Sequence, residues 1–467
     1  MGEDIWPLTG RGATSRAFAA GELSVNIYEP LLRLGSDYSV QPGLAEHWEQ
    51  PDALTWRFHL RPGVTFHDGR PFTADDVVWS WSGRELLPTA VTSTLAADGV
   101  RRVDDLTVDF VTTTPNLALP EQLVHPEAPI VPKGAHNDST PAVGTGPYRL
   151  VSYQPHQQVT VERFDGYWGA KAKVGRLVFR FLPDAQSRVD ALRSGEVDMV
   201  AGLPADAASS LQADAGFRVV RASMGATEVL SVSPTGQLGA PGDGALRQAV
   251  SLAVDRAAYV ADVHKGLAEA GRWMAPPSVL GAGAGLVDSS PYDPDQARRL
   301  LDGAGWLPGP DGTRTNGTRR LDLTLIGGPA VAANALRLVA GQLGAVGVHA
   351  SVKKADDTVT YQQYRDKGFD LDLTVPHQND ANPAFLLAGR KSSDPDYQAF
   401  AAQAAGARTK EEAQTAAGEM MRILVNRDVT VIPLAGVYPL FAMRRAVDIA
   451  DPHPSSINQL WSVVTLS

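Results

Sequence analysis

Apolar and polar residues alternate in many short stretches between residues 22 and 164 of the 467-residue chain. In residues 54–60, LTWRFHL, every second side chain is apolar, so that one face of an extended segment is apolar and the other polar. The same period recurs in residues 106–111, 146–153 and 158–164, between turns that contain Pro and Gly. This pattern predicts half-buried strands and therefore a mainly β region.

Residues 66–81, FHDGRPFTADDVVWSW, combine a histidine, acids and tryptophans in a way that raises the question of a catalytic or metal site. The Asp-Gly dipeptide favours a reverse turn, and Thr73 and Asp76 have the spacing of a helix capping box. The acids also suit the positive end of a helix. The segment therefore predicts a strand end, a turn and a capped helix, while Trp81 and Arg84 are candidate ligand contacts.

From about residue 228 the apolar residues follow a helical period instead. Residues 245–260 predict one long amphipathic helix. Strands and helices then alternate, with strands predicted at 321–326, 348–354 and 369–375 and helices at 330–343 and 358–366. This order predicts a largely parallel sheet covered by helices.

Length, charge and cysteine content narrow the function. A chain of 467 residues exceeds the size of a single core, so more than one domain is expected. The net charge of −10 is spread along the chain without a basic cluster, which argues against nucleic acid as a partner. The absence of cysteine excludes disulfides, thiolate metal sites and cysteine nucleophiles. We predict no cofactor and no resident metal.

Membrane segments are not indicated. No apolar run approaches the roughly 18 residues of a membrane span, and the opening MGEDIWPLTG lacks the features of a signal peptide. We expect a soluble chain, and the opening also fits one whose signal or lipid-anchor cysteine has been removed.

Local signatures of catalysis are absent. Residues 143–148, VGTGPY, continue as a strand, whereas a phosphate loop leads into a helix. Neither a Gly-x-Ser-x-Gly nor a His-Glu-x-x-His motif occurs. A catalytic triad can be built from residues that lie far apart in the sequence and then leaves no local motif. A hydrolase on an unrelated scaffold is therefore kept as the third and weakest interpretation.

The segment 376–385, PHQNDANPAF, is the richest in hydrogen-bonding groups. It follows the predicted strand 369–375, and ligands of open α/β sheets bind beyond the carboxyl ends of strands. A solvated loop with turn-forming Asn and Asp is the alternative. We favour ligand contacts from His377, Gln378, Asn379 and Asp380.

Several segments, in an order that spans nearly the whole chain, form one combined pattern. They are IYEPLLRL (27–34), PGLAEHWE (42–49), LTWRFHLRPGVTFHDGRPFTADDVVWS (54–80), VGTGPYRL (143–150), DGYWG (165–169), SRVDALRSGEVDMV (187–200), LRQAVSLAVDR (246–256) and YDPDQARRLLDGAGW (292–306). The segment at 54–80 is the most specific. Together the segments resemble one family, the family 5 extracellular solute-binding proteins, which serve ABC importers of oligopeptides, dipeptides, nickel complexes and related solutes.

The resemblance implies an α/β, bilobed periplasmic-binding-protein-like fold of type II, in its large peptide-binding subclass. Lobe I would comprise residues 1–227 and 439–467, with a mainly β subdomain around 40–160, and lobe II residues 228–438. Two hinge segments would join the lobes, which close on the solute without catalysis.

The ligand contacts of the family carry over with departures. Peptide binders usually hold the free amine with an aspartate, where this chain has Asn379 followed by Asp380. Nickel-type members commonly place an arginine just before the segment that matches 126–133, where this chain has Glu127 and Ala128, and His377 takes the place of their cleft tryptophan. Two further candidate contacts are His125 and Tyr438. A lone histidine such as His125 is more often structural, and Tyr438 lies where the chain would return from lobe II to lobe I.

These observations predict a monomeric receptor for a short peptide or peptide-like solute. It would act outside the cytoplasmic membrane, in the periplasm or at the cell surface, with an ABC permease as partner and membrane attachment only through a lipid anchor upstream. The alternative solute is a nickel or other metal–chelator complex, in which His377 would ligate the metal.

Overall fold

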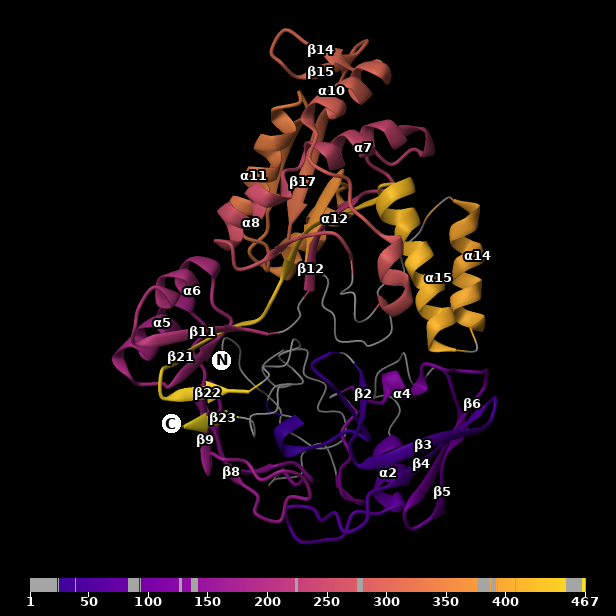
Figure 1. The fold of residues 1–467 in the computed structure, drawn as a ribbon, viewed down its shortest axis with the longest axis vertical. Coiled ribbons are helices and arrows are strands. Elements are labelled where there is room, and N and C mark those ends of the chain that lie inside the picture. Colours follow the sequence, from indigo (N-terminus) through magenta and orange to yellow (C-terminus); the bar gives the residue numbers. More distant parts are fainter. Residues whose placement is uncertain are drawn as a thin grey trace. The chain divides into compact units, whose positions relative to one another are not determined.

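The computed structural model describes residues 23, 25–37, 39–82, 92, 94–125, 128–135, 142–222, 226–274, 280–375, 387, 392, 394–407, 409–450 and 464–466. The chain forms two compact units (Figure 1). Unit 1 comprises Met1–Met224, Asn379–Ala381 and Pro439–Ser467, and unit 2 comprises Gly225–Gln378 and Asn382–Tyr438. Both units contain helices and sheets, so the predicted α/β class is confirmed.

A four-stranded antiparallel sheet of order β3-β4-β6-β5 opens unit 1. Its strands are β3 (Ala45–Asp52), β4 (Thr55–Leu60), β5 (Leu95–Asp104) and β6 (Thr107–Thr112). The strands predicted at 54–60 and 106–111 are thus confirmed. Leu54 departs from the predicted apolar face, because it lies in the turn before β4 and is 38% exposed.

Helix α2 (Ala74–Trp81) packs on β5 and β6. Its predicted capping box is present, since the Asp76 carboxylate accepts a hydrogen bond from Thr73 N at 2.8 Å. Before it, Gly69 has a φ of 87° and donates to Phe66 O in a reverse turn. Residues 66–81 are therefore a turn and a capped helix, as the sequence indicates.

Two further sheets complete the main part of unit 1. The antiparallel sheet β7-β8-β9 shares a core with Tyr28 and Phe441, and β21 lies between β10 and β11 in a second antiparallel sheet. The elements are β1 (Leu32–Leu34), β2 (Val40–Pro42), α4 (Leu119–Gln122), β7 (Tyr148–Gln154), β8 (Gln158–Arg163), β9 (Arg176–Arg180), α5 (Ala185–Ser194), β10 (Met199–Ala201), α6 (Ala205–Gln212), β11 (Phe217–Arg221), β21 (Leu440–Arg444), β22 (Val447–Ile449) and β23 (Val464–Leu466).

Unit 2 is built on a six-stranded mixed sheet of order β13-β20-β12-β19-β17-β18. The strands are β12 (Ala226–Val232), β13 (Glu269–Ala270), β17 (Asp322–Gly327), β18 (His349–Lys354), β19 (Leu371–Thr374) and β20 (Val431–Val437). The predicted alternation is confirmed as β17, α11 (Ala333–Gly344), β18, α12 (Thr358–Asp366) and β19, with β17 parallel to both neighbours. The prediction of a largely parallel sheet is wrong, because β12 pairs antiparallel with both β19 and β20, and β13 pairs antiparallel with β20.

The single helix predicted at 245–260 is wrong, because the chain forms α7 (Gly244–Ala253) and α8 (Arg256–His264) there. Val254 between them is extended, and the Asp255 carboxylate accepts from Ala258 N at 3.0 Å, which starts a new helix. The remaining elements are η2 (Pro241–Asp243), η3 (Gly281–Leu286), α10 (Pro294–Gly303), β14 (Leu307–Pro308), β15 (Arg314–Asn316), β16 (Arg319–Arg320), α14 (Pro395–Gly406), α15 (Lys410–Arg422) and η4 (Ile423–Arg427).

In the described ranges, no helix combines the length and the apolar composition that crossing a membrane requires.

Candidate functional site

One edge of the six-stranded sheet brings together the ends of strands β17, β19 and β20 and the start of β12. Strands β17 and β19 run parallel, so their carboxyl ends at Gly327 and Thr374 lie on the same edge. Strand β12 runs opposite to β19 and β20, which places its first residue Ala226 beside Val437, the last residue of β20. We call this edge the exit edge, because unit 2 is entered and left from it.

The segment predicted to carry the main ligand contacts leaves from the exit edge. It begins at residue 376, two positions after the end of β19. His377, Gln378, Asn379 and Asp380 lie outside the described residues, as do Arg84 and Glu127. Their assignment as ligand contacts therefore stays a prediction.

Three predicted contacts lie within the described residues. Trp81 ends α2 in the core of unit 1, where it is 3% exposed and its ring meets that of Phe110 edge-on at 5.2 Å between centroids. His125 follows α4 in the same unit and is half-buried, and its carbonyl oxygen accepts from Ala128 N at 3.0 Å. Tyr438, also half-buried, is the last residue of unit 2. Of the three, Trp81 offers the least surface to a solute.

A buried carboxylate stands at the start of β12. Glu228 is 6% exposed and accepts from the Tyr259 hydroxyl at 2.7 Å, and its Oε2 lies 2.8 Å from His264 Nε2. Burial, followed by the Glu228 charge, raises the pKa of Tyr259 above its usual range, which keeps the hydroxyl a donor. These side chains tie α8 to the strand that enters unit 2.

A second buried carboxylate supports β19 just before the predicted binding segment. Asp372 is 2% exposed and accepts from the Tyr361 hydroxyl at 2.7 Å, while Arg365 Nη1 lies 3.3 Å from its Oδ2. Burial and the hydrogen bond to Asp372 raise the pKa of Tyr361 above its usual range. Helix α12 therefore fixes the strand from which the segment leaves.

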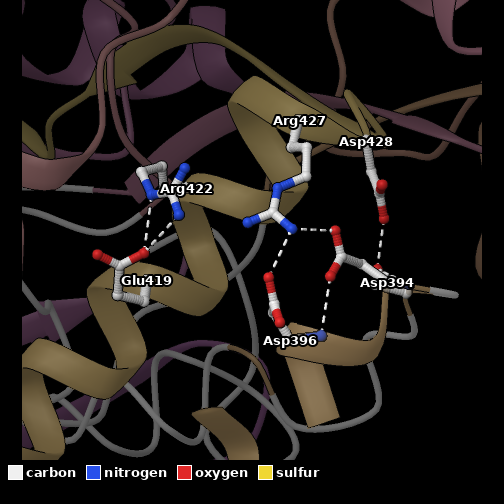
Figure 2. A network of polar contacts seen from close by, with 7 residues as sticks. Asp394, Asp396, Glu419, Arg422, Arg427 and Asp428 are labelled. Atoms are coloured by element: carbon white, nitrogen blue, oxygen red, sulfur yellow. Dashed lines mark hydrogen bonds and ion pairs between the residues drawn. The ribbon is translucent and has the colours of Figure 1, made fainter. Parts of the chain in front are cut away.

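An ionic network holds the residues that follow this segment. Figure 2 shows Arg427 between two carboxylates, with Nη1 2.6 Å from Asp394 Oδ2 and 2.9 Å from Asp396 Oδ2. Asp394 also accepts from Asp396 N at 2.9 Å and so caps α14. The Ser392 hydroxyl donates to the Asp428 carboxylate. The chain after the predicted binding segment is thereby anchored to η4.

In unit 1, a buried glutamate organises the DGYWG segment. Glu29 is 1% exposed, pairs with Arg33, and accepts from the Tyr167 hydroxyl at 3.1 Å and Trp168 Nε1 at 2.8 Å. Arg33 and Arg61 lie over the Trp168 ring, with 4.8 and 4.2 Å from guanidinium carbon to ring centroid. The partners of Glu29 make this cluster structural.

The GTG turn at 144–146 is also structural. A Cβ on Gly144 would lie 2.0 Å from Ile27 O, and one on Gly146 would lie 2.5 Å from Asn26 O, so the backbone approach requires glycine. His67 bonds to both glycines. The turn therefore packs on the chain at 26–27, in agreement with the prediction that it is no phosphate loop.

The buried roles of Glu29 and Glu228 could hardly be predicted from the sequence, because all their described partners except Arg33 lie far away in the chain. The one available signal was the position of Glu228 at the change from alternating to helical periodicity. Across the described ranges, no group of three or more His, Asp or Glu side chains is arranged to hold a metal ion.

Comparison with known proteins places these features in a family. Residues 39–398 match the model of the bacterial extracellular solute-binding proteins, family 5, middle region. The nickel-binding periplasmic protein of Escherichia coli K12 is 28% identical over 403 residues, which cover 80% of this chain and 74% of that protein. The dipeptide-binding protein of the same organism is 32% identical over 322 residues, which cover 60% of this chain and 58% of that protein.

The fold agrees with that of a solved relative. NikA from Brucella suis, crystallised with Fe(III)-EDTA, superposes with a TM-score of 0.86 at 22% identity, covering 100% of this chain and 99% of NikA. The predicted periplasmic-binding-protein fold is therefore confirmed. The protein belongs to the bacterial extracellular solute-binding proteins of family 5.

Proposed function

We propose that the protein captures a short peptide or peptide-like solute outside the cytoplasmic membrane and delivers it to the permease of an ABC importer. The observation that carries this proposal is the family match across residues 39–398. Among the relatives, the dipeptide-binding protein has the higher identity of the two described above.

The proposed solute site centres on the segment 376–385. Support comes from its departure at the exit edge, because ligands of open α/β sheets bind beyond the carboxyl ends of strands. Asp380 would pair with the ammonium group of a peptide through a charge-assisted bond. Arg84, His125, Glu127 and Tyr438 are proposed as further contacts, with Trp81 as a buried support.

Capture would proceed by closure of two lobes. Apart from the short stretch Asn379–Ala381, which also belongs to unit 1, the chain passes between the units after Met224 and after Tyr438. We take these as the two hinge segments, since a few element-terminal residues commonly absorb the rotation of a closing domain. The protein would act as a monomer in the periplasm or at the cell surface.

A metal–chelator complex is the second candidate solute. It is favoured by the similarity to the nickel-binding protein, which extends over 403 residues, and by the resemblance to the fold solved with Fe(III)-EDTA. His377 would then ligate the metal through a neutral imidazole nitrogen. Either solute would be released chemically unchanged, so no catalysis is proposed.

Thermal unfolding with two probes tests the proposal. A solute that binds only the folded protein raises its stability by RT ln(1 + [L]/Kd), about 2.7 kcal/mol at a hundredfold excess over Kd. We expect the dipeptide Ala-Ala to raise the melting temperature and Fe(III)-EDTA to leave it unchanged. The reverse result would establish the second candidate, and hydrolysis of Ala-Ala would establish an enzyme. Native mass spectrometry of the freshly purified protein supplies an independent reading of the bound solute.

A further inference from the structure

Two buried side chains of α2 bond to the backbone of a segment that lies more than 50 positions later in the chain. We call this segment, residues 128–135, the strap. Asp76 Oδ1 accepts from Lys133 N at 2.8 Å, and Ser80 Oγ accepts from Val131 N at 2.9 Å. Asp76 is 6% exposed and Ser80 is 2% exposed. The polar face of α2 thus accepts hydrogen bonds from the backbone amides of two alternate strap residues, Val131 and Lys133.

Both side chains are also fixed within α2. The second oxygen of Asp76 accepts from Thr73 N at 2.8 Å and Thr73 Oγ1 at 3.0 Å, and the Ser80 hydroxyl donates to Asp76 O at 2.7 Å. Neither side chain can therefore turn away from the strap without breaking a bond of the helix. The position of α2 and that of the strap are coupled.

The strap also bonds to the backbone of the buried Glu29 described above. Ile130 N donates to Glu29 O at 2.9 Å in an isolated bridge, and the Glu29 side chain is itself fixed by Trp168. Ala128, Ile130 and Val131 are buried, with exposures of 1%, 0% and 0%. The strap is therefore bonded both to α2 and to the backbone at Glu29.

The first residue of the strap bonds to a candidate solute contact. Ala128 N donates to His125 O at 3.0 Å, so a hydrogen bond joins the strap to the backbone of that histidine. We infer that Asp76 and Ser80 are positioning residues for the solute, which act through the strap on His125. This inference rests on the proposed function and deepens it.

Serine-to-alanine variants separate positioning from stability. Ser80→Ala removes the acceptor of Val131 N and leaves the capping box in place. Ser251→Ala is the matched control, because Ser251 is also 2% exposed, and its hydroxyl bonds to Arg256 within unit 2. Asp76→Asn is a second test variant, which keeps the side-chain shape while changing one acceptor into a donor.

Two measurements are made on each variant. Amide hydrogen exchange of peptides covering 128–135 reports the strap without any solute. Calorimetric titration with Ala-Ala reports affinity. For Ser80→Ala and Asp76→Asn we expect faster exchange in the strap and a Kd raised about tenfold, the effect of losing one buried hydrogen bond at a site. For Ser251→Ala we expect both to match the parent protein, although its melting temperature falls.

Three outcomes decide the matter. Faster exchange with an unchanged Kd would overturn the positioning role and leave the proposed function intact. Equal rises of Kd in all three variants would also overturn it, since the effect would follow stability alone. If the parent protein binds neither Ala-Ala nor Fe(III)-EDTA, the proposed function fails, and unchanged strap exchange in Ser80→Ala then refutes the coupling by itself.

Discussion

His67 Nε2 donates a hydrogen bond to the backbone oxygen of Gly146 across 3.0 Å. The other ring nitrogen, Nδ1, accepts from Gly144 N at 3.3 Å, which fixes the neutral tautomer. A protonated ring could not accept this bond. His67, which first suggested a catalytic site, therefore stabilises the GTG turn through two hydrogen bonds. Because these bonds require the neutral ring, the stability of unit 1 should depend on pH.

Burial lowers the pKa of His67 below its ordinary value of 6.5. Because the folded-state pKa is the lower one, the unfolded chain binds the proton more tightly. The contribution of the neutral ring is thus complete above about pH 6.5 and is lost as the pH falls through the folded-state pKa. We expect His67→Asn to be less stable than the parent at pH 7.5 and to lose less stability between pH 7 and pH 5. Urea unfolding at several pH values checks this, and parallel curves would contradict it.

Two glycines should respond to alanine in opposite directions. A Cβ on Gly144 would meet Ile27 O at 2.0 Å, so Gly144→Ala should destabilise by more than about 3 kcal/mol or prevent folding. Gly341 lies inside α11 with no atom within 4 Å of its added Cβ, so Gly341→Ala should stabilise by about 0.5–1 kcal/mol. Denaturant midpoints distinguish the two, and a tolerated Gly144→Ala would refute the close backbone approach.

The buried hydroxyl of Tyr259 should matter more than an exposed one. Its hydrogen bond reaches the charged Glu228 carboxylate, and such bonds contribute about 1.5–3 kcal/mol. Tyr259→Phe should lose that amount, whereas Tyr292→Phe, at a residue 49% exposed, should change stability by less than about 0.5 kcal/mol. Chemical denaturation measures the free energy of unfolding of both variants. Equal losses in Tyr259→Phe and Tyr292→Phe would contradict a specific role of the Tyr259 hydroxyl.

Figure 2 shows two arginines whose ion pairs differ in the elements that they join. Arg427 joins Asp394 and Asp396 of α14 to η4, whereas Arg422 pairs with Glu419 three residues earlier in the same helix. Arg427→Met should therefore lower the urea midpoint more than Arg422→Met does, because it leaves the nearly buried Asp394 carboxylate without its cation. The gap between the variants should narrow in high salt. A larger effect of Arg422→Met would contradict the bridging role.

Asp380 provides the test of the amine anchor. If it pairs with the ammonium of the solute, Asp380→Ala should weaken Ala-Ala binding by about tenfold or more, and that of acetylated Ala-Ala hardly at all. Calorimetric titration of both peptides measures the difference. Equal weakening of the two would remove the anchor from the proposal.

The parts of the fold that follow from short-range pattern could be predicted from sequence. Thr73 and Asp76 lie within one helical turn, so their capping box is encoded locally, and the period of β17, β18 and β19 is visible along each strand. The break between α7 and α8 was missed because Asp255 fits a helical period yet serves as a cap. The capping acid favours a new start over continuation.

Long-range partners could not be predicted in the same way. Glu228 meets Tyr259 and His264 only after β12 and α8 have packed, and nothing in the composition of either segment specifies the other. The strap is similar, since Val131 and Ser80 are joined by a backbone amide that has no sequence signature. Such contacts depend on tertiary packing, which a single sequence does not display.

The strands β20 and β21 follow each other directly, and each occupies the interior of a different sheet: β20 between β13 and β12, and β21 between β10 and β11. A ribosome must therefore have produced residues 431–444 before either sheet can be assembled in full. Both sheets therefore depend on the same short segment, which supplies one interior strand to each. A nascent chain that ends before residue 431 would lack one interior strand in each of the two sheets.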